Sequence, residues 1–316
     1  DGAPVVTLQN SAQLNVANIK ASRGGEIVVT DATLTATGSI ELGHNAESAG
    51  KLTESGKSTI NGEIKLTATG STVASDGGLN VTTDIQDHKV VYENGEYKVV
   101  PCVYVAQVGE LKYESLQEAV NVGGEVTVLQ DITLTEGIVI PADKTVTLDL
   151  AGYTVSQTKE QTAGYQMILN DGTLTIKDSS DEKTGKLSYT DSGNGGEYIS
   201  DAIYNRSVLV IDGGTIENLS SATVATNGYP HAVDTYSGIR NTSVTINGGT
   251  IYCAEYSAIR MFCVSATYTA DLVINEGAIV KGAIDMQNGT LAAALGTLTI
   301  NGGTFETTKN ANNIRF

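Results

Sequence analysis

Five side chains in the last third of the chain have the chemistry of an acid–base site. Arg260 and Asp285 fall on the same face of the predicted strands, Asp234 and Glu255 lie near strand ends, and His231 lies in an apparent insertion. Glycoside hydrolases need two carboxyl groups facing each other across the scissile bond, and calcium-dependent polysaccharide lyases need clustered carboxylates beside a base. Asp285, Glu255 and His231 are therefore the catalytic candidates to inspect, but the pattern assigns no catalytic residue and favours a protein without enzymatic activity.

Tyrosine and arginine recur at matching positions of successive predicted strands. One outward column reads Leu169, Tyr204, Arg240, Arg260 and Asp285, a second reads Tyr165, Ser200, Tyr236, Tyr256 and Lys281, and a column of small residues reads Ala202, Gly238, Ala258 and Ala283. Neighbouring strands lie about 4.8 Å apart, so these columns would form a shallow floor between an aromatic and a basic row. Such a face suits an extended glycan, with predicted contacts at Tyr204, Tyr236, Arg240, Tyr256, Arg260 and Asp285. The alternative is ordinary solvated strand residues, because tyrosine has a high strand propensity.

The strands that would carry these side chains share a phrase centred on isoleucine. It reads Met-Ile-Leu-Asn at 167–170, Ala-Ile-Tyr-Asn at 202–205, Gly-Ile-Arg-Asn at 238–241, Ala-Ile-Arg-Met at 258–261 and Ala-Ile-Asp-Met at 283–286. Because side chains alternate between the two faces of a strand, we expect an inward aliphatic ladder of Ile168, Ile203, Ile239, Ile259 and Ile284. Asn170, Asn205 and Asn241 would form an amide ladder beside it, which ends where methionine replaces asparagine.

A second phrase is a strand, a turn close to Asn-Gly-Gly-Thr, and another strand. Its turn residues, Asp212, Asn247, Asn275 and Asn301, lie 35, 28 and 26 residues apart. A supersecondary unit that recurs at such a period is typical of a solenoid. Residues 1–86 carry looser versions of the same phrase, so we expect coils there as well.

The repeat is interrupted near residue 90. Alternating strands flank Asn94-Gly95, which predicts a hairpin over 89–100 with a tight type I′ turn. Ser115 and Glu118 form a capping box, which predicts a short helix over 115–121. A helix just before a run of coils can cover the open apolar end of the first coil. Coils restart at Glu125, and 220–236 is predicted to be an insertion.

Composition supports strands and turns and excludes several functions. The chain has 35 glycines, no tryptophan and a net charge of −17, from 36 acidic against 19 basic residues. Nucleic acids and anionic membranes attract basic patches, so we expect neither as a partner. No apolar run approaches the roughly 20 residues that cross a bilayer, so we expect no membrane insertion. The start of the sequence carries no methionine and no signal peptide, as in a trimmed chain.

Metal-ligating patterns are sparse. His44, His88 and His231 are isolated and are predicted to be surface residues. The oxygen-rich segments 178–182 and 191–194 could offer ligands to calcium, but neither follows the EF-hand spacing. We therefore expect no metal and no cofactor. Cys253 and Cys263 flank the Arg260 strand and are predicted to be buried apolar residues, with a disulfide as the alternative.

Several segments together resemble a known family. Residues 113–120, 126–129 and 138–155 are similar to the start of the pectin-lyase-like right-handed β-helix modules of large, adhesin-like surface proteins from gut Firmicutes and Bacteroidetes. Residues 84–100 are similar to the tail that closes such a module. The resemblance implies an all-β, right-handed parallel β-helix. It also implies that 1–100 are the last coils and closing hairpin of one module, and that 101–316 are a second module without its closing segment, within a longer chain.

These observations predict a cell-surface, non-enzymatic module with an elongated face for a glycan or for a host or bacterial surface protein, or a stalk spacer between neighbouring modules. The alternative is a carbohydrate-active enzyme, either a polysaccharide lyase or a glycoside hydrolase. The enzyme would show at least two carboxylates pointing into a cleft. The binding face would show the tyrosine and arginine rows exposed and aligned, and the spacer would show neither.

Overall fold

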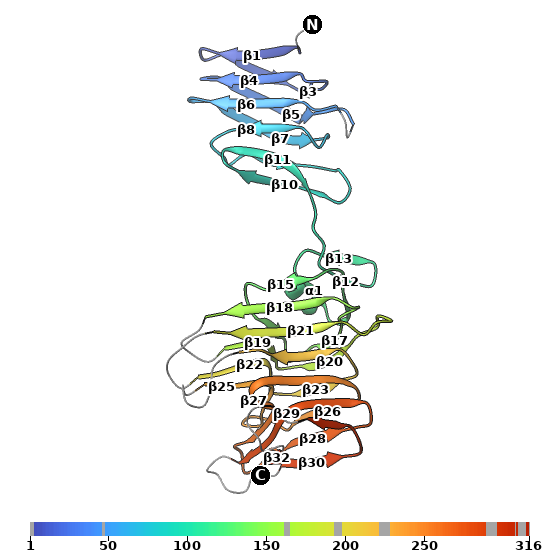
Figure 1. Cartoon of the computed structure of the whole chain (residues 1–316). Coiled ribbons are helices and arrows are strands. Elements are labelled where there is room, and N and C mark those ends of the chain that lie inside the picture. Colours follow the sequence, from blue (N-terminus) through green and yellow to red (C-terminus); the bar gives the residue numbers. More distant parts are fainter. Residues whose placement is uncertain are drawn as a thin grey trace. The chain divides into compact units, whose positions relative to one another are not determined.

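The computed structural model describes residues 3–45, 48–160, 165–192, 198–220, 228–288, 296–306, 308 and 314–315. They form two compact units, Asp1–Val103 and Tyr104–Phe316. Both units are nearly all β, and most of their strands pair in parallel and curl around an apolar core (Figure 1). Within the described residues no helix is long and apolar enough to span a membrane.

The first unit consists of two sheets that face each other across a core. One sheet has the strand order β1 (Val5–Gln9), β4 (Glu26–Thr30), β6 (Lys51–Ser55), β8 (Thr72–Ala74), β11 (Glu96–Pro101) and β10 (His88–Glu93). The other contains β2 (Gln13–Val16), β5 (Thr33–Leu42), β7 (Thr59–Leu66) and β9 (Val81–Thr82), with β3 (Ile19–Ala21) paired to β5. Residues such as Ile27, Leu34 and Ile64 fill the space between them and are at most 1% exposed.

The predicted hairpin closes this unit. Strands β10 and β11 pair antiparallel, and both turn residues, Asn94 (φ 53°) and Gly95 (φ 79°), have the left-handed backbone of a type I′ turn. Strand β11 also pairs antiparallel with β8. The hairpin therefore covers the edge that the parallel strands would otherwise leave open.

The second unit begins with a short antiparallel segment and the predicted helix. Strands β12 (Ala106–Val108) and β13 (Leu111–Tyr113) pair with each other, and α1 spans Leu116–Val122. The Ser115 hydroxyl accepts a hydrogen bond of 3.4 Å from the Glu118 amide, which confirms the helix start. Leu116, Ala119 and Val120 of α1 are buried in the core of the unit, as expected for a helix that covers the first coil.

The rest of the second unit winds through the same strand positions again and again. One sheet contains, in order, β14 (Gly124–Val128), β17 (Thr145–Asp149), β20 (Thr173–Lys177), β23 (Val208–Ile211), β26 (Thr242–Ile246), β28 (Ala270–Ile274) and β30 (Gly296–Ile300). All these neighbours pair in parallel. Between them the chain crosses a second, larger sheet, which has two branches.

The strands of the first branch come directly after the turns in the sequence, as β24 does after the turn at Asp212. It contains β15 (Ile132–Thr133), β18 (Thr154–Lys159), β21 (Lys186–Asp191), β24 (Thr215–Asn218), the first part of β27 (Gly249–Cys263), the first part of β29 (Ala278–Asn288) and β31 (Thr304–Glu306). The second branch contains β16 (Ile138–Ile140), β19 (Tyr165–Asn170), β22 (Tyr198–Asn205), β25 (Gly228–Tyr236), the later parts of β27 and β29, and β32 (Ile314–Arg315). The second branch carries the site described below.

The isoleucine ladder of the second branch is confirmed except for one member. Ile168, Ile203, Ile259 and Ile284 are at most 1% exposed, but Ile239 is 54% exposed. Val233 of β25 pairs with Ile203 on one side and Ile259 on the other, so it occupies the rung predicted for Ile239. The phrase 238–241 is instead a bend between β25 and β26, and part of the supposed insertion 220–236 is a strand.

The same shift changes the amide ladder. The Asn170 side-chain amide donates to the Asn205 side-chain oxygen at 2.7 Å, as predicted. Asn241 is exposed and accepts from the Thr269 amide, so its expected place in the ladder is wrong. Thr235 pairs with Asn205 instead, and Met261 follows it.

The turn phrases form a second ladder at an exposed corner. The side-chain amide of Asn247 donates to the Asp212 carboxylate at 2.7 Å, that of Asn275 to the Asn247 oxygen at 2.7 Å, and that of Asn301 to the Asn275 oxygen at 2.8 Å. The glycine two residues after each of these side chains has a left-handed backbone: Gly214, Gly249, Gly277 and Gly303. The corner therefore repeats in both backbone and side chain.

Two carboxylates stabilise the oxygen-rich loop after β20. Asp178 accepts from the amides of Gly152 (2.9 Å), Ser180 (3.1 Å) and Gly185 (2.6 Å), and Asp149 accepts from the amides of Ala151 and Ser179. Backbone donors thus take up the oxygens that calcium would need from Asp178. Segment 191–194 lies partly outside the described residues.

These two carboxylates predict an acid-sensitive fold. Burial works to raise the pKa of each, but the hydrogen bonds to the ionised form outweigh it, so the pKa of Asp149 and that of Asp178 lie below the ordinary value of 3.8. Their stabilisation is present above the unfolded pKa, about 3.9, and is lost as the pH falls through the folded pKa. Urea unfolding should show a steeper loss of stability below pH 4 for the wild type than for Asp178→Asn, and equal slopes would contradict this assignment.

Candidate functional site

In the second branch, the regular pairing between β22 and β25 is interrupted at one residue of each strand, and the branch bends there. Asp201 pairs with His231 and Ile203 pairs with Val233, but the residues between them, Ala202 and Ala232, are fully buried. Ala258 is also fully buried, so Ala202 and Ala258 of the predicted outer floor lie in the core, whereas Gly238 lies in the bend after β25. Because two successive residues point inward at this bend, the outward side chains before and after it converge.

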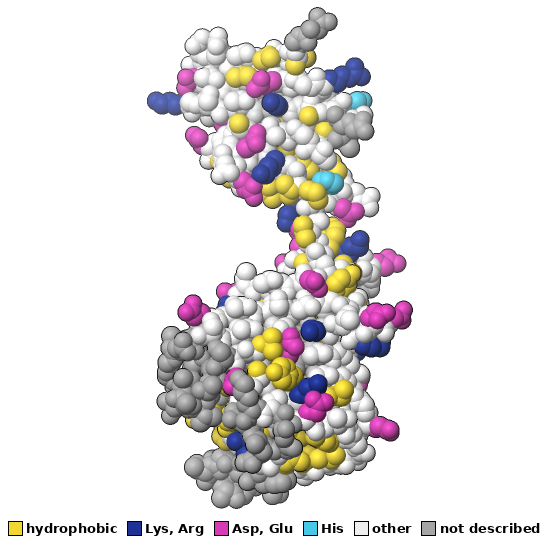
Figure 2. All heavy atoms as spheres, in the orientation of Figure 1, with side chains coloured by type: hydrophobic (Ala, Val, Ile, Leu, Met, Phe, Trp, Pro, Cys, Tyr) yellow, Lys and Arg dark blue, Asp and Glu magenta, His cyan; other side chains and the backbone are white. Residues whose placement is uncertain are grey.

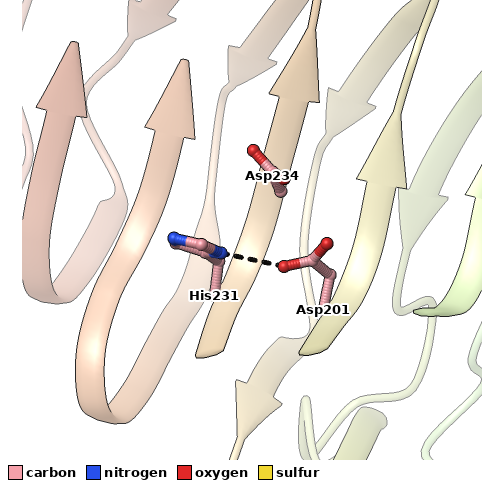
Figure 3. Close-up of side chains that lie close together, drawn as sticks. All are labelled: Asp201, His231 and Asp234. Atoms are coloured by element: carbon pink, nitrogen blue, oxygen red, sulfur yellow. Dashed lines mark hydrogen bonds and ion pairs between the residues drawn. The ribbon is translucent and has the colours of Figure 1, made fainter. Parts of the chain in front are cut away.

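Three of the converging side chains form a buried cluster. Asp201 on β22 and His231 and Asp234 on β25 lie with their ligand atoms within 4.8 Å of one another. His231 Nδ1 and Asp201 Oδ1 are 2.9 Å apart, and Figure 3 shows the two side chains pointing toward each other from neighbouring strands. His231 and Asp234 are fully buried and Asp201 is 3% exposed, so the prediction of a surface position for His231 is wrong.

Arg260 completes the cluster from the next strand. It pairs in register with Asp234, donates Nε to Asp234 Oδ1 at 2.7 Å and donates Nη2 to Oδ2. Its guanidinium group also lies 5.2 Å from the ring centroid of Phe262. Among the described residues Nη1 has no hydrogen-bond partner, although the side chain is only 11% exposed.

Burial and neighbouring charges set the protonation of the cluster. The pKa of Asp201 lies well above its ordinary value because of burial and the negative charge of Asp234. Burial also raises the pKa of Asp234, and Arg260 opposes that rise. Burial and the positive charges of Arg260 and Arg315 hold the pKa of His231 well below its ordinary value. Burial thus favours the protonated form of Asp201 and the neutral form of His231, whereas Arg260 favours the ionised form of Asp234.

A pocket of about 280 Å³ opens onto this cluster. Its polar lining consists of Gln166, Asp201, Asp234 and Arg260, and its aromatic lining consists of Tyr204, Tyr236 and Phe262. We call it the Asp201 pocket. The Tyr236 ring lies 6.3 Å from that of Tyr204 and 6.1 Å from that of Phe262, centroid to centroid, so the three rings form a continuous wall. Burial and then Asp234 raise the pKa of Tyr204, which keeps its hydroxyl protonated.

The structure separates the predicted binding residues. Tyr204, Tyr236 and Arg260 line the Asp201 pocket. Arg240 lies in the bend after β25 and donates to the Asp171 carbonyl at 2.8 Å, so it does not form a row with Arg260. Tyr236 pairs in register with Phe262 and not with Tyr256. The Tyr256 ring lies against the His231 ring instead, with 5.6 Å between the two ring centroids.

None of the three catalytic candidates, His231, Glu255 and Asp285, lines the Asp201 pocket. Asp285 pairs in register with Arg260 and is only 4% exposed, and its carboxylate forms an ion pair of 2.9 Å with Arg315. Glu255 is half-buried in the stretch of β27 where the pairing register shifts.

Both cysteines near the site, Cys253 and Cys263, are buried free thiols, which excludes the disulfide between them.

Sequence reasoning did not bring Asp201 and Asp234 together. The available signal was the recurrence of a polar residue followed by Ala-Ile at 201–203 and by Ala-Val at 231–233. Valine and isoleucine are interchangeable as inward β-branched residues. Isoleucine recurs at Ile239 but not at Val233, so the isoleucine pattern aligns 238–241 with this rung and does not place Asp234 beside Arg260.

The same cluster has the atom types of a metal site, but its charges disfavour that use. A cation bound by Asp201, His231 and Asp234 would compete with the Arg260 guanidinium, which already contacts both oxygens of Asp234. The raised pKa of Asp201 also favours its protonated form, with which a cation would compete. The chain matches no family model, no curated protein and no solved structure.

Proposed function

We propose that the chain is part of an adhesin-like protein of the cell surface and that its second unit binds one sugar residue of a glycan in the Asp201 pocket. We further propose that both units are right-handed parallel β-helix modules. What supports the handedness is that each coil returns to the same sheet in parallel, and such crossovers are right-handed in about 98% of cases.

The combination of an aromatic wall with buried polar groups carries the proposal of a sugar site. Sugars present apolar C–H faces that stack on aromatic rings and hydroxyl groups that pair with fixed donors and acceptors. The wall of Tyr204, Tyr236 and Phe262 supplies the first, and Arg260 Nη1 and the Asp201 carboxyl group supply the second. A pocket of about 280 Å³ lies at the small end of ligand sites, roughly 300–1,000 Å³, which suits one sugar ring better than a long chain.

The charge around the site favours a weakly charged ligand. Arg260 neutralises Asp234, and burial raises the pKa of Asp201 and so disfavours a charge there. The chain as a whole is at −17, and Figure 2 shows acidic and basic side chains interspersed on the visible face. A polyanionic polysaccharide would meet repulsion at long range, so we propose neutral glycans as the ligands.

Binding to a glycan array, followed by titration calorimetry of the ligands that bind, tests the proposal. Tyr236→Ala should weaken binding about fivefold or more, because loss of one stacking ring costs about 1 kcal/mol or more. Tyr153→Ala removes a 38%-exposed tyrosine of the same unit that does not line the pocket and should leave affinity unchanged.

Two outcomes would overturn the sugar site. Equal affinity of the wild type and Tyr236→Ala would place the ligand elsewhere on the unit. Absence of binding to any glycan would favour a spacer, or a surface-protein partner that a pull-down with the intact chain would then reveal.

A further inference from the structure

One nitrogen of the Arg260 guanidinium group has no acceptor in the Asp201 pocket. Nε and Nη2 donate to the two oxygens of Asp234, and among the described residues Nη1 has no hydrogen-bond partner. Asp285, which pairs in register with Arg260 on the next strand, forms its ion pair with Arg315 instead. Guanidinium nitrogens only donate hydrogen bonds, and a largely buried donor without an acceptor costs free energy. A ligand in the pocket should therefore bring an acceptor to Nη1.

The two carboxyl groups of the pocket are already occupied by protein groups. Asp201 and Asp234 are hydrogen-bonded to each other, and Asp201 Oδ1 also lies 2.9 Å from His231 Nδ1. Both oxygens of Asp234 accept from Arg260. A hydrogen-bond donor on the ligand would have to compete with these contacts. The pocket beside Arg260 thus favours a ligand group that accepts a hydrogen bond and does not donate one.

The surface beside the guanidinium group is apolar. Phe262 follows Arg260 by two residues on β27, so both side chains lie on the same face of the strand. The guanidinium carbon is 5.2 Å from the centroid of the Phe262 ring. The other two rings of the wall, Tyr204 and Tyr236, carry hydroxyl groups, whereas a phenyl ring has no polar atom. A ligand group at this end of the wall should therefore combine an acceptor with an apolar neighbour.

Resting on the proposed sugar site, we propose that the sugar in the Asp201 pocket carries an acetyl group, whose carbonyl oxygen accepts from Arg260 Nη1 and whose methyl group packs on Phe262. A carbonyl oxygen only accepts, so it brings no proton that would need an acceptor of its own. A hydroxyl group in the same place would bring one, beside carboxylate oxygens that Arg260 already holds. The acetyl group is also uncharged, so it adds no long-range repulsion from a chain with a net charge of −17.

Sugars carry acetyl groups in two ways. An acetamido sugar has the group on nitrogen and an O-acetylated sugar has it on oxygen, and both present the same carbonyl and methyl groups to the pocket. Mild alkali removes the ester and leaves the amide, so one treatment distinguishes the two sources.

A glycan array with matched pairs tests the proposal with the full chain. The pairs are terminal N-acetylglucosamine against glucose, N-acetylgalactosamine against galactose, and O-acetylated galactose before and after mild alkali. Titration calorimetry then gives the ratio of affinities within the pair that binds. The acetylated member should bind about tenfold more tightly or better, because it adds a hydrogen bond to a charged donor and buries a methyl group.

Three variants locate the acetyl group through this ratio. Phe262→Ala removes the surface for the methyl group, and Arg260→Lys keeps a positive charge for Asp234 but has no second arm for the carbonyl oxygen. Each should bring the ratio close to that of equal affinities, with circular dichroism to check the fold. Tyr204→Ala removes a ring from another part of the same wall. It should weaken both members of a pair by a similar factor and leave the ratio at the wild-type value.

The outcomes separate this inference from the proposed function. Equal or weaker binding of the acetylated members would overturn the acetyl group and leave the sugar site. A wild-type ratio in Phe262→Ala would overturn the assigned contacts, even if Arg260→Lys does not fold. Absence of binding to every glycan on the array would overturn both proposals.

Discussion

Replacing Arg260 by alanine should lower the free energy of unfolding by about 3–5 kcal/mol, the usual cost of removing one partner from a buried ion pair. Asp234 is fully buried and receives two hydrogen bonds from Arg260. Without the guanidinium group, the carboxylate must either stay charged in an apolar setting or take up a proton beside Asp201. Urea unfolding at pH 7 measures the loss.

Two variants show whether the buried charge is the cause. Asp234→Ala/Arg260→Ala should cost less than the sum of the two single changes, because neither charge is left alone. Arg206→Ala removes a partner from a more exposed pair, whose side chains are 32% and 18% exposed, and should cost about 1 kcal/mol or less. A loss of similar size for Arg206→Ala and Arg260→Ala would contradict the explanation.

The second large effect is expected at the exposed corner, from Gly249→Ala. Gly249 has φ +86°, and an added Cβ would lie 2.4 Å from the carbonyl oxygen of Gly214 in the coil before it. The left-handed backbone alone costs a residue with a side chain about 1–3 kcal/mol, and the contact with fixed backbone adds to that. We expect a loss above about 2 kcal/mol in thermal or urea unfolding.

Gly213→Ala is the matched control. It is the first glycine of an equivalent turn, has no positive φ, and its added Cβ would come no closer than 3.4 Å to any atom. It should change stability by less than about 1 kcal/mol. If both alanine variants unfold at the same urea concentration, then neither the left-handed backbone nor the close approach explains why the turn has glycine at position 249.

The features that depend on local chemistry could be predicted from the sequence. The Asn94-Gly95 hairpin, the Ser115 cap and the inward isoleucines follow from turn geometry, capping and alternation, each of which acts over a few residues. Repetition then extends these short-range signals across the coils. The structure thus agrees with the expectation of an all-β chain of stacked parallel strands.

The site could not be predicted because it depends on one register choice and one bend. Choosing Ile239 over Val233 displaced a whole strand, which put Arg240 into a row where Asp234 belongs. Strict alternation also placed Ala202 and Ala258 outside, whereas the bend turns two successive residues inward. An acidic pair that converges across two strands at such a bend leaves no spacing signature along the chain.

The corner ladder of Asp212, Asn247, Asn275 and Asn301 has a direction, because every side-chain amide donates to the preceding coil. A carboxylate can only accept hydrogen bonds, so aspartate fits at the end of the row that receives the last donated bond. Asparagine fits at the positions where a side chain must both donate and accept a hydrogen bond. The single acidic member of the series stands at that end. The aspartate therefore fixes the orientation of the amides along the row, because the neighbouring asparagine must present its nitrogen to the carboxylate and its oxygen to the next asparagine.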